Sequence, residues 1–118
     1  MDTPNKISII ILAAGLSKRY NGNKLLVKID GVPLIRKTVE IYLETEPYEI
    51  IVVVGHEQQK IKSALNGLNL KFVSNKKYKT GQSSSVIEGI LSTNKNTEGY
   101  LFGLADQPFI SKEIINKI

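Results

Sequence analysis

The amino-acid sequence predicts an α/β protein in which a parallel β-sheet carries helices on both faces. Two apolar runs, at 7–12 and 50–55, are rich in β-branched residues and have the length of strands buried on both faces. Segments with a helical spacing of apolar residues separate these runs from two further strand-like stretches, at 70–73 and 100–105. This alternation favours parallel strands joined by right-handed crossovers.

The first half of the chain supplies one loop, one turn and one helix after the strand at 7–12. Residues 13–23 have the small and polar composition of a loop, and a short apolar stretch at 25–29 ends at the turn signal Asp30-Gly31. Pro33 can open a helix, and Pro47 closes the segment. The apolar residues between these prolines share one helical face: Ile35, Val39, Tyr42 and Leu43.

The second half predicts three more helices. Residues 57–66 read as a helix that stops at Gly67, and a polar loop at 74–82 leads to a helix capped by Ser83 or Ser84. We expect this helix to carry the apolar residues Val86, Ile87, Ile90 and Leu91. A last helix begins at Ser111 and reaches the chain end after about two turns, which fits either a short terminal helix or a helix that is cut.

Composition indicates a single domain over residues 1–118. Sixteen Lys and Arg against eleven Asp and Glu leave a net charge of +5, which mildly favours an anionic partner. There are no cysteines, so disulfides, thiolate metal sites and cysteine nucleophiles are excluded. No apolar run approaches the ~20 residues of a membrane helix. The amino terminus also lacks a cationic leader, so we expect a cytoplasmic protein that does not bind membranes.

The loop after the first strand is the most informative segment. Ligands of an open parallel sheet bind at the carboxyl ends of its strands, where this loop begins. Small residues let backbone N–H groups approach an anion, and hydroxyl, guanidinium and ammonium groups add donors and charge. The residues of this candidate phosphate-binding loop are Leu12, Ala13, Ala14, Gly15, Ser17, Arg19 and Lys24. The spacing matches neither a Walker A loop nor Gly-x-Gly-x-x-Gly, and the alternative is a glycine-rich surface turn with incidental cations.

Other polar residues follow the remaining strands at the same edge. Asp106 comes directly after the strand at 100–105 and could hold Mg²⁺ beside a triphosphate, or simply form a turn before Pro108. His56 follows the second strand, where a lone histidine is more often structural than ligand-binding. Four further residues could read a base or ribose, with helix capping as the alternative: Asn75, Gly81, Ser84 and Ser85. A basic stretch, with lysines at 76, 77 and 79, is either solvated or attracts an anionic substrate.

These motifs together carry a family resemblance. The pattern Leu12-Ala13-Ala14-Gly15-x-Ser17-x-Arg19 with Lys24 downstream resembles the signature loop of nucleotidyltransferases with a Rossmann-like fold of the glycosyltransferase-A, or nucleotide-diphospho-sugar transferase, type. The segments 75–86 and 104–108 narrow this to the MobA-like molybdenum cofactor nucleotidyltransferases, closest to their cytidylyltransferase branch. The resemblance runs from about Ile7 to the chain end.

The resemblance implies a role for each of these residues. The backbone of 12–15 would contact the nucleotide, and Arg19 and Lys24 would neutralise the triphosphate during catalysis. Asn75 and the segment 81–85 would line the base and ribose, and Asp106 would bind Mg²⁺ as a catalytic metal ligand. The Ala-Ala-Gly form of the loop favours CTP.

The implied reaction is Mg²⁺-dependent transfer of CMP from CTP to a phosphate of molybdopterin, or molybdenum cofactor, with release of pyrophosphate. Two alternatives stay open: transfer to a sugar or polyol phosphate on the same fold, and a nucleotide-binding module without turnover. Nucleic acid is not an expected partner, since the basic stretch lacks an aromatic stacking platform.

Two departures from the family pattern stand out. Tyr20 and Asn21 precede Gly22 where an apolar residue and glycine are usual, and the chain is shorter than family members, so we expect the amino-terminal part of a domain.

Overall fold

A computed structural model of the chain describes residues 6–14 and 24–105. One long strand lies before residues 15–23, and two short strands form a separate hairpin after them. The elements in chain order are β1 (Ile7–Ala13), the 3-10 turn η1 (Lys24–Leu26), β2 (Lys28–Ile29), β3 (Val32–Pro33), α1 (Leu34–Leu43), β4 (Glu49–Val54), α2 (Gln58–Ala64), β5 (Lys71–Ser74), η2 (Tyr78–Thr80), α3 (Gln82–Leu91) and β6 (Gly99–Leu104). The predicted loop at 15–23 and the predicted helix at 111–118 lie outside the described residues.

The main sheet is parallel, as predicted. Its strand order is β5-β4-β1-β6, and β1 pairs in parallel with both β4 and β6. Ile10 of β1 stands opposite Ile51 of β4 on one side and Phe102 of β6 on the other. All four carboxyl ends therefore meet at one edge of the sheet, which we call the carboxyl edge, and the opposite edge is the amino edge.

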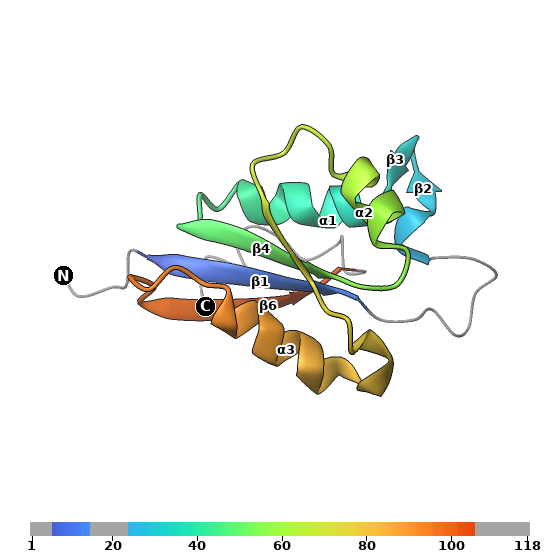
Figure 1. Ribbon diagram of the computed structural model, residues 1–118. Coiled ribbons are helices and arrows are strands. Elements are labelled where there is room, and N and C mark those ends of the chain that lie inside the picture. The colour runs from blue at the N-terminus through green and yellow to red at the C-terminus, as the bar shows by residue number, and fades with distance from the viewer. Residues whose placement is uncertain (1–5, 15–23, 106–118) are drawn as a thin grey trace.

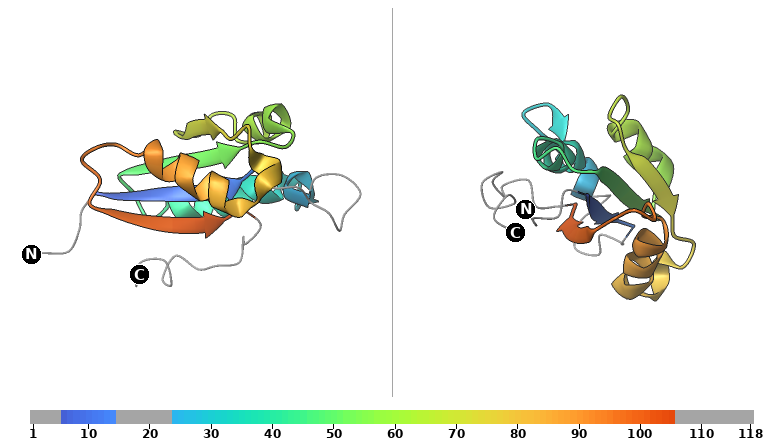
Figure 2. Two further views of the ribbon diagram at one scale, coloured as in Figure 1. Left: turned by 60° about the horizontal axis from the view of Figure 1, so that its bottom comes forward. Right: turned by 90° about the vertical axis from the view of Figure 1, so that its left-hand side faces the viewer.

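Helices cover both faces of this sheet, which confirms the predicted class. Figure 1 shows α1 and α2 above the sheet and α3 below it, and the right-hand view in Figure 2 shows the same two layers end-on. The central strands β1 and β4 are buried on both faces, because alternate side chains enter the two cores: Ile9 and Ile11 pack with α1 and α2, and Ile10 packs on the α3 side. This burial explains their almost continuous apolar sequence.

The segment before α1 forms a small antiparallel hairpin that the sequence pattern did not predict. Lys28 pairs with Pro33, and Ile29 pairs with Val32. Asp30 and Gly31 have φ of 55° and 83°, so the predicted turn takes the left-handed geometry that suits a two-residue hairpin. The helix α1 then begins at Leu34, one residue after Pro33.

The helix α3 begins earlier than predicted, and several of its apolar residues are exposed. It begins at Gln82 after Gly81, so Ser83 and Ser84 lie inside the helix and neither caps it. Three of the four expected apolar residues are exposed, by 55%, 37% and 75%: Ile87, Ile90 and Leu91. The buried residues are Ser85 and Gly89, and a Cβ at position 89 would come within 2.5 Å of Ile10 Cγ2. Small residues therefore decide the inward face, because only they permit this close approach.

A carboxylate ties the loop before β6 to the amino edge. Oε2 of Glu49, the first residue of β4, accepts hydrogen bonds from Ser8 Oγ at 2.5 Å and the Asn94 backbone N–H at 2.7 Å. The Thr97 hydroxyl donates to the same oxygen at 3.3 Å.

Helices long and apolar enough to cross a membrane are absent from the described part of the chain.

Candidate nucleotide-binding site

The end of β1 brings the start of the predicted phosphate-binding loop to the carboxyl edge. Ala13 and Ala14 are 2% and 1% exposed, and Leu12 is half-buried. The Ala14 carbonyl accepts a hydrogen bond at 3.2 Å from the backbone N–H of His56, which follows β4. This bond fixes the backbone where it enters the loop. Gly15, Ser17 and Arg19, which the sequence assigned to the same site, lie outside the described residues.

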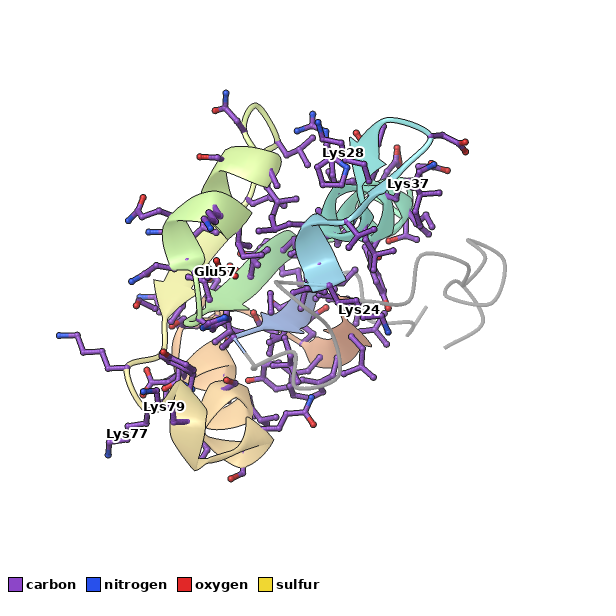
Figure 3. The ribbon with its side chains drawn as sticks, turned by 90° about the vertical axis from the view of Figure 1, so that its right-hand side faces the viewer. Lys24, Lys28, Lys37, Glu57, Lys77 and Lys79 are labelled. Atoms are coloured by element: carbon purple, nitrogen blue, oxygen red, sulfur yellow. The ribbon has the colours of Figure 1, made fainter. Side chains whose placement is uncertain are left out.

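Lys24 lies at the same edge, on the other side of the gap in the described chain. It is the first residue of η1 and is exposed, and its carbonyl accepts a hydrogen bond at 3.2 Å from the backbone N–H of Val27. Figure 3, which looks onto the carboxyl edge, shows Lys24 beside the strand ends. A lysine in this position supplies a positive charge that is suited to a phosphate oxygen.

Asn75, directly after β5, is 2% exposed and uses its amide inside the protein. Its Nδ2 donates to Ser84 Oγ at 3.0 Å and to Ser85 Oγ at 2.9 Å, and its Oδ1 accepts from the Lys77 backbone N–H at 2.9 Å. Its own backbone N–H donates to the Val54 carbonyl at 2.7 Å. Asn75 thus joins β4, the loop at 76–81 and the first turn of α3. Both of its side-chain N–H groups already have partners.

Gly81 and the serines form the start of α3 beside this network. Gly81 has a φ of 121°, in the left-handed region that favours glycine, and it directly precedes α3. Ser84 Oγ lies 3.0 Å from the Gly81 carbonyl and 3.1 Å from the Lys77 carbonyl, whereas Ser85 is 4% exposed. Gly81 and Ser84 are the members of this group that reach the surface. Asn75 and Ser85 support them from below.

A second cluster at the edge was only partly foreseen. His56 Nε2 lies 3.4 Å from Glu57 Oε1, and Lys60 Nζ lies 2.8 Å from Glu57 Oε2. The His56 and Tyr78 rings are 6.1 Å apart, and Tyr78 packs so closely on Gly55 that a Cβ there would come within 2.7 Å of it. Sequence reasoning noted His56 but missed the packing of Tyr78. The glycine after a buried strand was the available signal for such a close approach.

The described residues contain no group of three or more His, Cys, Asp or Glu side chains that could hold a metal. Such a cluster is not required beside a nucleotide, because Mg²⁺ takes one or two carboxylates together with phosphate oxygens and water. The donor expected from the sequence, Asp106, lies outside the described residues, two positions after β6 ends at Leu104.

Residues 9–118 match the MobA-like NTP transferase domain. The chain belongs to this family. Among curated proteins it is 31% identical over 114 residues to a bifunctional protein GlmU of Francisella tularensis subsp. novicida, covering 95% of this chain and 24% of that protein. A nucleotidyl transferase structure from Methanothermobacter thermautotroptrophicus superposes with a TM-score of 0.87 at 29% identity, covering 97% of this chain and 56% of the other.

A second solved relative extends this comparison of the MobA-like domain. It is the 4-diphosphocytidyl-2C-methyl-D-erythritol synthase of Anaerococcus prevotii, with a TM-score of 0.79 at 26% identity. The match covers 96% of this chain and 49% of that structure. The chain therefore spans about half the length of these structures and about a quarter of the GlmU protein.

Proposed function

We propose that the chain forms the nucleotide-binding part of a Mg²⁺-dependent nucleotidyltransferase, which transfers CMP from CTP to a phosphate of molybdopterin or molybdenum cofactor. The observation that carries the proposal is the meeting of Ala13-Ala14, Lys24 and the Gly81–Ser84 turn at the carboxyl edge, in a chain whose family is defined by NTP transfer. This edge is where open parallel sheets bind nucleotides.

In this reaction an oxygen of the acceptor phosphate attacks the α-phosphorus in line. The new P–O bond forms as the bond to the β-phosphate oxygen breaks, and the electron pair leaves with pyrophosphate. An ionised acceptor phosphate needs no general base, so the protein's task is to position the groups and to neutralise charge.

The chain's own cations supply part of this neutralisation. Lys24 lies at the carboxyl edge, where its positive charge would neutralise the triphosphate. Arg19 would act with it as a bidentate donor. Asp106 would hold Mg²⁺, which supplies charge stabilisation on phosphate oxygens when bound. Gly81 would offer backbone groups to the base or ribose, and Ser84, whose hydroxyl proton is already donated within the turn, would act there only as an acceptor. Asn75 and Ser85 keep that turn in place.

The choice of CTP rests on the Ala13-Ala14-Gly15 form of the loop. The relative from Anaerococcus prevotii favours it too, because its name describes a diphosphocytidyl product. The same name, with methylerythritol as the acceptor, supports a second candidate function: transfer to a sugar or polyol phosphate. A third candidate, nucleotide binding without turnover, stays open beside these two.

Calorimetric titration of CTP, GTP, ATP and UTP, each with and without Mg²⁺, tests the proposal. We expect Mg²⁺-dependent binding with a preference for CTP, weakened in Lys24→Gln and unchanged in Lys95→Gln, an exposed lysine in the loop that is tied to the amino edge. A preference for another nucleotide would change the substrate and leave the reaction class intact. Absence of binding by every nucleotide would overturn the proposal. Pyrophosphate release with each phosphorylated acceptor then separates the candidate reactions.

A further inference from the structure

Three lysines follow Asn75 within four residues, and the roles described above do not use their charge. Lys76, Lys77 and Lys79 are all exposed, and we call residues 76–79 the basic loop. The basic loop begins at the carboxyl end of β5, so it belongs to the same edge as the candidate site. Figure 3 shows Lys77 and Lys79 beside α3, with Lys24 on the other side of the strand ends.

The backbone of the basic loop is held from both sides. The Lys77 N–H donates to Asn75 Oδ1 at 2.9 Å, and the Lys77 carbonyl accepts from Ser84 Oγ at 3.1 Å. Between the lysines, the half-buried Tyr78 packs on Gly55 at the end of β4. The chain therefore presents these ammonium groups from a fixed position beside the site, at the ends of long side chains that extend into solvent.

Charge is distributed unevenly between the two edges of the sheet. Among the described residues, the amino edge and the turn leading into β4 carry four glutamates, which outnumber the three lysines there: Glu44, Glu46, Glu49 and Glu98 against Lys6, Lys71 and Lys95. At the carboxyl edge Glu57 already contacts Lys60 at 2.8 Å and His56 at 3.4 Å, so its charge is largely offset. The basic loop and Lys24 lie on opposite sides of the strand ends at this edge (Figure 3). The described part of the molecule is thus polarised along its strands, with the positive end at the candidate site.

We infer that the basic loop is an electrostatic steering element, which speeds the arrival of the nucleoside triphosphate at the carboxyl edge. The inference rests on the proposed nucleotide site and adds a kinetic role to it. A surface patch of one charge sign beside a binding site raises the association rate of an oppositely charged ligand. At physiological ionic strength, salt largely screens charges that are more than about 8–10 Å apart. Exposed lysines that act at a distance change the association rate far more than the dissociation rate.

The test compares two double variants that remove the same charge from opposite edges. Lys76→Gln with Lys79→Gln neutralises the basic loop and leaves Lys77, whose backbone is bonded to Asn75 and Ser84. Lys6→Gln with Lys95→Gln is the matched control, because both lysines are exposed, Lys6 immediately precedes β1 and the turn of Lys95 is bonded to Glu49 at the start of β4. Circular dichroism confirms that both variants fold. Stopped-flow mixing with a fluorescent analogue of the preferred nucleotide gives association and dissociation rates at low and high salt.

We expect the basic-loop variant to associate about 3- to 10-fold more slowly than wild type at low salt, with a dissociation rate within about twofold and the difference lost at high salt. The control should stay close to wild type. An equal slowing in both variants would reduce the effect to net charge and overturn the inference. A raised dissociation rate alone would make the lysines direct ligands instead. Unchanged rates in a chain that binds nucleotide would overturn steering and leave the proposed function standing, whereas absence of nucleotide binding would overturn both.

Discussion

Replacing Asn75 with alanine tests how the carboxyl edge is built. The substitution removes three hydrogen bonds, from Nδ2 to the two serine hydroxyls and from the Lys77 N–H to Oδ1. At a net value of about 1 kcal/mol for each bond, we expect the free energy of unfolding to fall by about 3 kcal/mol. The buried position, 2% exposed, prevents water from replacing these bonds without rearrangement.

Asn94→Ala is the matched control for this experiment. Asn94 Oδ1 accepts a hydrogen bond at 2.9 Å from the backbone N–H two residues ahead, just as Asn75 does, but Asn94 is exposed. Its loss should cost about 1 kcal/mol or less. Urea unfolding followed by circular dichroism measures both variants. If Asn75→Ala proved no more destabilising than Asn94→Ala, the network would not hold the edge together.

Three further substitutions, the first with a control, test the packing of α3, the pH dependence of stability and the amino edge. Gly89→Ala should lower the unfolding free energy by about 1–3 kcal/mol, because its Cβ would meet Ile10 at 2.5 Å, whereas Leu91→Ala on the exposed face of the same helix should change it by about 0.5 kcal/mol or less. Burial raises the pKa of Tyr42 above its ordinary 10.0, so this tyrosine ionises at lower pH in the unfolded chain, and the stability of the wild type falls as pH rises through and above 10.0. Tyr42→Phe lacks this ionisation, so its urea midpoint should fall less over the same pH range. Parallel pH dependences of the two midpoints would contradict this. Glu49→Gln should lower the free energy of unfolding by about 2 kcal/mol and speed hydrogen exchange of the Asn94 backbone amide, because Glu49 Oε2 accepts hydrogen bonds from that amide and from the Ser8 and Thr97 hydroxyls. Unchanged exchange would show that the loop before β6 is held by other contacts.

Much of the fold could be predicted because its signals are local. The β-branched runs at 7–12 and 50–55 correspond to β1 and β4, and the spacing of Ile35, Val39 and Tyr42 identified the buried face of α1. The turn at Asp30-Gly31 was also readable, since few residues accept its backbone geometry. Strand and helix alternation, together with the preference for right-handed crossovers, then led to the carboxyl edge as the place of the site.

The candidate site was only partly predictable. Sequence reasoning selected Asn75, Gly81, Ser84 and Ser85 as a group, and the structure does bring them together. It did not separate the residues that reach the surface from those that support them. That distinction depends on how deeply each residue is buried once the chain has folded, and Asn75 and Ser85 are 2% and 4% exposed. The positions of Arg19 and Asp106, and their roles with the nucleotide and Mg²⁺, stay predictions.

The sequence by itself determined the order of the four long strands and of the helices between them, the parallel sheet and the edge at which the chemistry-bearing loops gather, because side-chain periodicity and backbone sterics act over a few residues. Only the tertiary structure decided which face of α3 turns inward, the pairing of β2 with β3 and the partners of Asn75. In α3 the apolar residues Ile87 and Leu91 are exposed while Gly89 lies against the sheet. Periodicity identifies residues that share a face, but the closeness of approach between two surfaces depends on the shapes of both, and those shapes exist only once the chain has folded.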